Sequence, residues 1–135
     1  MKLEILLVED YAHPIGKVWA ALTDPAALAE WLMVNDFEPQ VGKRFTLRGE
    51  RSAEWRGWMD CAVLEMEPPR RMVWSWQSSE SSDPTRVEFR LEPIEGGTRL
   101  TLMHTGDTDP GARGRLSSGW PVKLGNLGSL LAKTD

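Results

Sequence analysis

An aspartate–proline step, Asp24-Pro25, divides an apolar stretch near the start of the chain into two parts. Ile15, Val18 and Leu22 precede the step at helical spacing, which predicts a helix with one buried face. The residue before a proline avoids the helical region, so this helix is expected to end at the step. A second helix is expected to begin there, because aspartate caps free N–H groups and proline suits the first helical position. Its apolar face comprises Leu28, Trp31 and Leu32.

Most of the remaining chain up to residue 104 consists of short apolar segments that alternate with period two and end at turn residues. In one of them, for example, Phe45 and Leu47 share a face. The last two segments flank a turn at residues 95–97 and predict a hairpin. Strands are expected over Leu3 to Tyr11, Arg44 to Arg48, Trp55 to Met66, Arg70 to Gln77, Arg86 to Leu91 and Thr98 to His104.

A last helix is expected to begin near Ser117 or Ser118, because apolar residues then recur at i, i+4, i+7 and i+11. Gly125 and Gly128 lie inside this helix, where each costs about 1 kcal/mol relative to alanine. A close approach of the helix to the sheet is the leading explanation; room for a ligand or a second subunit is the alternative. The apolar stripe comprises Trp120, Leu124, Leu127 and Leu131.

Composition and charge exclude several classes of protein. The length of 135 residues suits one domain, expected to span residues 1–135. The net charge of −4 argues against a dedicated nucleic-acid binder. The lone Cys61 rules out an internal disulfide and a cysteine-based zinc site, and its apolar strand suggests a small core residue. The sequence shows neither a signal-like segment nor an apolar run of the ~20 residues that span a bilayer. We therefore expect no membrane insertion and a cytoplasmic location.

The order of the expected elements predicts an α+β fold. A strand and two helices precede a run of antiparallel strands, and a long helix ends the chain. A sheet with one apolar face needs a cover, and the last helix supplies an apolar stripe of matching length. The sheet must then curve around this helix, while the two short helices close one end. Such an arrangement leaves a space between sheet and helix that suits an apolar ligand.

Several motifs follow one another along nearly the whole chain. They are Val18 to Pro25, Trp31-Leu32, Pro39 to Phe45, Val63 to Met72, Trp76, Gly97 to Leu102 with His104, and Gly119 to Pro121 followed by Leu124, Leu127 and Leu131. With these motifs the chain resembles the START-like (SRPBCC) superfamily, and within it the homologues of the heat-shock-protein-90 ATPase activator. The resemblance implies a helix-grip fold and a cavity for hydrophobic or amphipathic small molecules. Some branches of the superfamily act as polyketide cyclases or aromatases.

Two side chains are candidates for proton transfer. His104 ends a strand and shares a face with Leu100 and Leu102; a structural hydrogen-bonding role is favoured over that of a general acid or base. Asp60 lies two residues from Trp58; burial would raise its pKa, although a solvent-exposed position is favoured. The sequence has no nucleophile elbow, phosphate loop or metal-ligand spacing. We therefore expect no metal, no cofactor and no established catalytic residue.

Seven tryptophans suggest either a generous core or a lined cavity. Met72, Trp74 and Trp76 share a strand face and are expected to lie opposite Trp120 on the last helix. They either build an aromatic wall or simply fill the core. If a cavity exists, His104 supplies its polar contact. The expected ligand-binding residues are Trp31, Phe45, Trp58, Met72, Trp74, Trp76, Phe89, His104, Trp120 and Leu124.

The leading functional prediction is therefore the binding of a small apolar or aromatic molecule, with a stress-related role as one option. One alternative is a cyclase- or hydrolase-like enzyme that acts on a polyketide-like substrate through His104 or Asp60. Another is a domain that modulates a chaperone ATPase. The sequence is compatible with a monomer or a homodimer.

Overall fold

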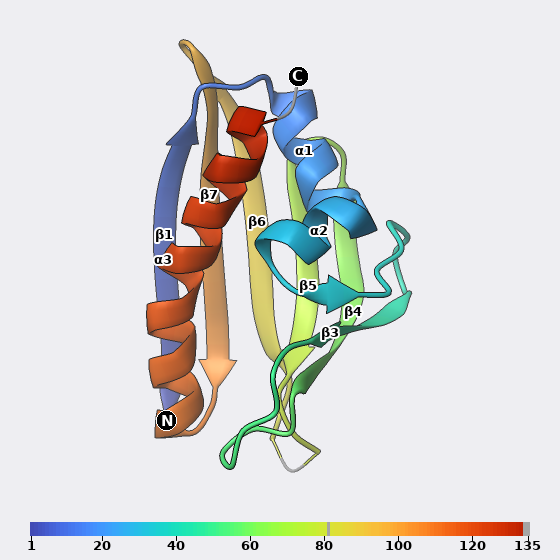
Figure 1. Ribbon diagram of the computed structural model, residues 1–135, viewed down its shortest axis with the longest axis vertical. Helices are drawn as coiled ribbons and strands as arrows, with labels where there is room; N and C mark the ends of the chain where they lie inside the picture. The colour runs from blue at the N-terminus through green and yellow to red at the C-terminus, as the bar shows by residue number, and fades with distance from the viewer. Residues whose placement is uncertain (81, 134–135) are drawn as a thin grey trace.

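The fold is described from a computed structural model covering residues 1–80 and 82–133. Antiparallel strands form one seven-stranded sheet, and helices pack on one of its sides (Figure 1). This arrangement confirms the predicted α+β helix-grip fold. The elements are β1 (Lys2–Tyr11), α1 (Ile15–Thr23), α2 (Pro25–Trp31), β2 (Val34–Asn35), β3 (Arg44–Arg48), β4 (Trp58–Glu67), β5 (Arg71–Gln77), β6 (Thr85–Ile94), β7 (Gly97–Asp107) and α3 (Pro110–Lys133).

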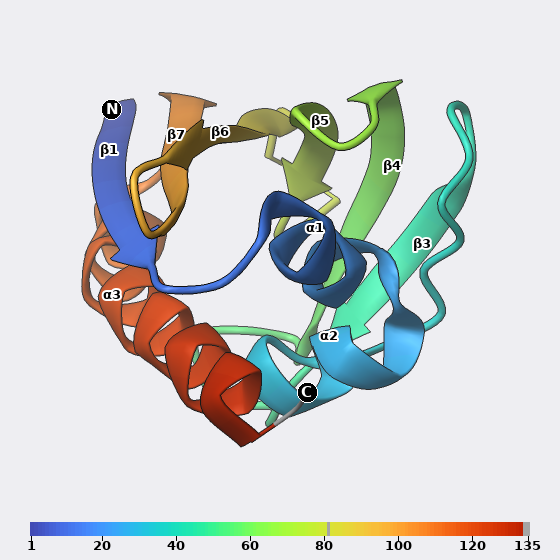
Figure 2. The same cartoon turned by 90° about the horizontal axis from the view of Figure 1, so that it is seen from above.

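The sheet is strongly curved and has the strand order β1-β7-β6-β5-β4-β3-β2. Figure 2 shows α1, α2 and α3 on its concave side, with α3 lying along β1 at one edge. The C-terminal end of α3 lies near α1 and α2, so the two short helices close one end of the space that the sheet encloses. Among the described residues, no helix has the length and apolar character needed to cross a membrane.

The predicted break between the two short helices is confirmed. α1 ends at Thr23, and Pro25 is the first residue of α2. The side chain of Asp24 accepts a hydrogen bond from the backbone N–H of Ala27 at 3.1 Å, as expected of an N-terminal cap. The indole N–H of Trp31 donates to the carbonyl of Ala21 at 2.9 Å and fixes α2 against α1.

α3 begins at Pro110, about two turns before the predicted start near Ser117 or Ser118. Asp109 provides the reason, because its side chain accepts a hydrogen bond from the N–H of Ala112 at 2.8 Å. Its carbonyl also accepts from the N–H of Arg113 at 3.0 Å. An aspartate–proline pair therefore starts this helix as it starts α2, although glycines at 111 and 114 make the sequence of the first turns resemble a loop.

The apolar stripe of α3 is buried as predicted, but the explanation offered for its glycines holds at one position only. A Cβ on Gly128 would lie 3.4 Å from Cε1 of Tyr11, so the helix does approach β1 there. The hydroxyl of Tyr11 also donates to the carbonyl of Leu124 at 2.8 Å. Gly125 is exposed and a Cβ there would meet nothing within 4 Å, so close approach to the sheet does not account for this residue.

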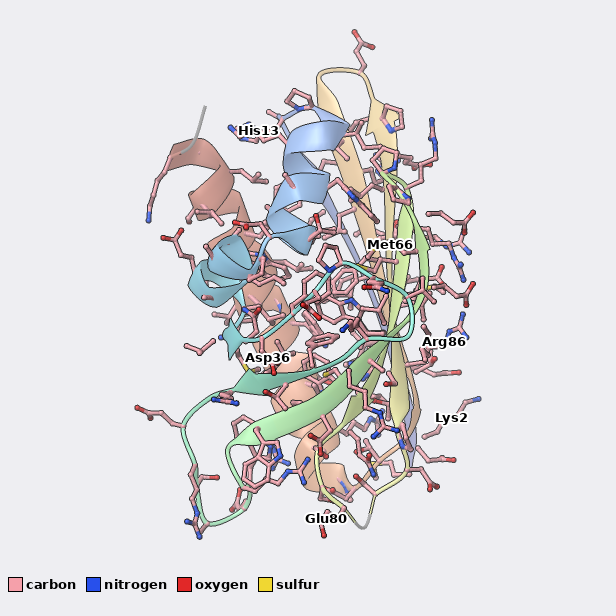
Figure 3. The ribbon with its side chains drawn as sticks, turned by 90° about the vertical axis from the view of Figure 1, so that its right-hand side faces the viewer. Lys2, His13, Asp36, Met66, Glu80 and Arg86 are labelled. Atoms are coloured by element: carbon pink, nitrogen blue, oxygen red, sulfur yellow. The ribbon has the colours of Figure 1, made fainter. Side chains whose placement is uncertain are left out.

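The β6–β7 hairpin places His104 on the concave face of the sheet. Val87 of β6 pairs with His104 of β7, and Phe89 pairs with Leu102, with all four side chains buried. On the opposite face, Arg71 and Arg86 form ion pairs with Glu65 and Glu88. Figure 3 shows Arg86 projecting from the side of the sheet that faces away from the helices. The concave face is therefore the apolar one.

Candidate functional site

A pocket of about 190 Å³ lies beside the N-terminal half of α3, at the end of the molecule away from α1. Its walls come from α3, the residues after α2, the loop between β3 and β4, the adjoining ends of β4, β5 and β6, and the residue after β7. Most of the lining side chains are apolar, so the pocket suits an apolar molecule. These are Leu32, Met33, Trp55, Met59, Trp76, Ala112, Leu116 and Trp120.

Two tryptophans meet at the inner side of this pocket. The rings of Trp76 and Trp120 lie 5.4 Å apart between centroids, at an interplanar angle of 48°. Trp76 comes from β5 and Trp120 from α3, and they are 3% and 2% exposed. Their contact joins the sheet to the helix and forms a rigid aromatic boundary, the part of the predicted aromatic wall that borders a cavity.

His104 holds this boundary in place from behind. The indole N–H of Trp120 donates to Nδ1 of His104 at 3.0 Å. An indole nitrogen only donates, so Nδ1 is the acceptor and the ring proton is on Nε2. Nε2 lies 2.7 Å from Oγ1 of Thr85 and donates to it, while the Thr85 hydroxyl donates to the carbonyl of Trp76 at 3.0 Å. Thr85, Trp76 and Trp120 line the pocket, whereas His104 lies one layer deeper.

This hydrogen-bond network also fixes the protonation state of His104. The side chain is fully buried, and burial lowers its pKa from 6.5 to about 3. Both ring nitrogens are engaged in the neutral form, one as acceptor and one as donor. The geometry corresponds to the structural role that the sequence favoured for this residue.

The loop between β3 and β4 brings Trp55 to the pocket. A Cβ on Gly49 would lie 3.1 Å from Cη2 of Trp55, so the indole packs directly on the backbone at this glycine. The N–H of Gly49 donates to the carbonyl of Gly57 at 2.8 Å and closes the loop. Gly57 has a φ of 102°, which favours glycine. The loop is therefore shaped to hold a large aromatic side chain over the pocket.

The rim of the pocket along α3 contains two basic residues and a glycine. Arg115, Gly119 and Lys123 recur every four residues and so share one face of the helix. A Cβ on Gly119 would meet nothing within 4 Å, so the pocket is open at this point. Asp83 in the loop between β5 and β6 is the acidic side chain among the lining residues.

Six of the ten residues predicted to bind a ligand belong to the core instead of the pocket wall. Trp74 illustrates why, since its ring packs against Phe45 at 5.0 Å and Phe89 at 4.7 Å between centroids. These contacts fill the space at this level of the sheet, as the second interpretation of the tryptophans expected. The six are Trp31, Phe45, Met72, Trp74, Phe89 and Leu124.

Trp58 and Asp60 point away from the concave face, because they alternate along β4 with the buried Met59 and Cys61. Trp58 is 40% exposed and lies under the guanidinium of Arg56, at 4.4 Å from the ring centroid. Arg56 also forms a salt bridge of 2.9 Å with Asp60. Asp60 is therefore a solvent-facing, paired carboxylate. Burial raises the pKa of the Cys61 thiol, in keeping with a core residue.

Much of the pocket wall was not anticipated from the sequence. Ala112, Arg115 and Leu116 belong to the first turns of α3, which were expected to be a loop. The aspartate–proline pair at 109–110 was the signal that could have found them. Trp55 was expected in a strand, and nothing in its local pattern indicates that it covers a pocket. Among the described residues, no group of three His, Cys, Asp or Glu side chains is arranged to hold a metal ion.

The curved antiparallel sheet, the C-terminal helix on its concave side and the two short helices after the first strand are those of a START-like (SRPBCC) protein. Residues 12–132 match the family described as "Activator of Hsp90 ATPase homolog 1-like protein". The chain belongs to this family. The wider fold family includes polyketide cyclases and ligand-binding proteins. A comparison with curated proteins finds no match for the chain.

Several solved structures share the fold over nearly the whole chain. Protein MLL2253 from Mesorhizobium loti is 36% identical, with a TM-score of 0.87 and 98% of each chain covered. CalU16 from Micromonospora echinospora is 30% identical, with a TM-score of 0.79, covering 95% of this chain and 75% of that chain. Protein BH1534 from Bacillus halodurans is 28% identical, with a TM-score of 0.77, covering 95% and 96%.

Proposed function

We propose that this protein binds a small apolar or aromatic molecule in the pocket beside α3. The observation that supports this most is the pocket itself, with Trp76 and Trp120 on its inner side and Trp55 over it. Rigid aromatic walls are typical of sites for flat apolar ligands, because ring stacking adds to the hydrophobic effect. The cytoplasmic location and the monomeric or dimeric state expected from the sequence remain predictions.

The pocket volume limits the size of the ligand. A dry cavity of about 150 Å³ holds a benzene molecule in an engineered protein, whereas drug-sized ligands occupy pockets of about 300 Å³ or more. A pocket of about 190 Å³ that opens along α3 therefore suits a molecule with one or two rings. Its body would lie against Trp76 and Trp120, and Thr85 would be the polar wall group in place of His104.

A substitution that fills the pocket tests this proposal. Gly119→Leu adds a side chain into the open space at the rim, and Gly125→Leu makes the same change on the exposed side of α3. We expect 2-naphthamide to bind the unaltered protein and Gly125→Leu alike, and Gly119→Leu at least about tenfold more weakly, since steric exclusion removes the burial of a ring.

The indole N–H signals in ¹H–¹⁵N spectra provide the readout. Trp55 and Trp76 line the pocket, so the ring current of a bound aromatic molecule should shift their indole N–H signals. Trp31 donates to Ala21 and lies outside the pocket, so its signal is the internal control. Equal affinities of the two leucine variants, or shifts of Trp31 alone, would contradict the proposal.

Catalysis has less support. His104 is neutral, with both ring nitrogens engaged, and Asp60 faces solvent in a salt bridge with Arg56. Neither is placed to move a proton on a molecule in the pocket. A role in chaperone activation rests on the family description alone, and an ATPase assay with added protein tests it directly.

A further inference from the structure

We infer that the molecule bound in this pocket is an anion: a carboxylate or similar acid group attached to a one- or two-ring aromatic body. The inference rests on the proposed function and adds the charge of the ligand. It depends on the two basic side chains of the α3 rim, Arg115 and Lys123.

Arg115 differs from the other half-buried arginines of the protein in its ion pairing. Arg56, Arg71 and Arg99 each form a salt bridge with at least one carboxylate. Arg115 and Lys123 are also half-buried, but neither forms a salt bridge with any described residue. Their aliphatic stems can cover the apolar rim while the charged groups stay at the mouth of the pocket. The rim thus holds two cationic groups that an anionic ligand would complement.

The spacing of the two residues suits a single acid group between them. Eight residues of helix separate their Cα atoms by about 12 Å, with Gly119 midway and nothing over it. In the structure Nη1 of Arg115 lies 3.3 Å from the Cβ position of Gly111, one turn closer to the start of α3, so the long Arg115 side chain has to turn toward Gly119 to share an acid group with Lys123. With Arg115 turned in this way, an acid group above Gly119 would meet both cations, while the ring enters the apolar part of the pocket beside Trp120.

The charge of the surroundings favours the same conclusion. The lining residues include two basic side chains and one acidic side chain, Asp83, whereas the chain as a whole has a net charge of −4. Asp83 is exposed and forms no salt bridge with Arg115 or Lys123. Exposed charges beyond about 8–10 Å are screened at physiological salt. Asp109 also lies near Arg115, because its Oδ1 and Nη1 of Arg115 are 3.2 Å and 3.3 Å from the same point, the Cβ position of Gly111. The excess of positive charge on which the inference depends is therefore that of the pocket lining itself.

The test compares probes that differ only in charge. 2-Naphthoate and 2-naphthamide have the same ring and nearly the same shape, and indole-3-acetate and indole-3-acetamide repeat the comparison on a second skeleton. We expect each acid to bind the unaltered protein about tenfold more tightly than its amide, because two partly buried charge contacts are gained. The preference should shrink as salt is added.

Charge-removing variants assign the effect to the two residues. Arg115→Gln and Lys123→Gln should each weaken 2-naphthoate about three- to fivefold and leave 2-naphthamide unchanged. Arg113→Gln is the matched control, because Arg113 is exposed on the same helix and does not line the pocket. Calorimetry or the indole signals provide the affinities.

The outcomes separate the two proposals. If acid and amide bind equally, or if Arg113→Gln has the same effect as Arg115→Gln, the inference about charge is wrong while the proposed pocket stands. If neither skeleton binds in either form, the proposed function fails and the inference fails with it. An acid preference that only Arg115→Gln and Lys123→Gln reduce supports both.

Discussion

His104 links the sheet to α3 through hydrogen bonds to residues that line the pocket. It connects Trp120 of α3 to Thr85 of β6, and Thr85 continues the connection to Trp76 of β5. Each of these three partners lines the pocket, so His104 orients the wall without contacting what the pocket holds. The sequence indicated a buried polar residue facing the concave side, and the network explains why a histidine suits this position.

His104→Gln should reveal the protonation state of this network. Folding holds the histidine neutral with a pKa of about 3, against 6.5 in the unfolded chain. Between these values the unfolded chain binds more protons, so the free energy of unfolding falls as the pH falls. Above pH 6.5 both states are neutral and the residue contributes no pH dependence. The variant should be about 1–3 kcal/mol less stable at pH 7, from broken hydrogen bonds.

At pH 5 the difference in the free energy of unfolding between the two proteins should narrow by about 2 kcal/mol. Only in the unaltered protein does protonation of residue 104 stabilise the unfolded chain. Urea unfolding at both pH values measures the difference, and the shared carboxylates cancel. An identical difference at pH 7 and pH 5 would mean that His104 titrates normally in the folded protein.

Two of the helices, α2 and α3, begin at an aspartate–proline pair. The first of these helix starts was predicted from the sequence, and the second was not. Asp24-Pro25 was recognised because clear apolar faces flank it, whereas Asp109-Pro110 is followed by glycine and arginine and was not. Both aspartates accept a hydrogen bond from the N–H three residues later. Helix starts were therefore encoded locally in both cases, and the polar character of the first turns of α3 concealed the second.

Glycine substitutions test how the elements approach one another. Gly125→Ala should stabilise the protein by up to about 1 kcal/mol, because the position is helical, exposed and free of contacts. Gly97→Ala should destabilise it by about 1–3 kcal/mol, because a Cβ there would lie 2.0 Å from the carbonyl oxygen of Tyr11. Urea unfolding of both variants measures this. A destabilising Gly125→Ala would mean that this face of α3 is covered.

At the scale of the whole molecule, the pocket is a meeting of segments that are far apart in the chain. Residues 32–33, Trp55, the adjoining ends of β5 and β6, and residues 112–123 surround it. No local pattern relates these segments, which is why the sequence selected the most apolar residues of the concave face instead. Those residues fill the core between the sheet and the helices. The pocket lies beside the N-terminal half of α3, where side chains do not fill this space.

Ligand binding should stabilise the whole molecule by linkage. A ligand that binds only the folded state at a concentration of 100 times its Kd adds about 2.7 kcal/mol to the free energy of unfolding. 2-Naphthoate should produce this shift in urea unfolding of the unaltered protein and of Gly125→Leu. In Gly119→Leu the same concentration should produce a much smaller shift, and an undiminished one would place the probe elsewhere on the molecule.

Local patterns in the sequence were enough to predict the fold class, the break between α1 and α2, and the face that His104 shares with Leu100 and Leu102, because periodicity and capping act over a few residues. The family followed from the resemblance of several motifs along the chain. Which aromatic side chains fill the core and which border open space depends on contacts between distant segments. Trp74 and Trp76 share one face of β5, yet Trp74 is enclosed by Phe45 and Phe89 while Trp76 faces the pocket beside Trp120. Their surroundings come from distant segments, and only the assembled packing determines where a cavity remains.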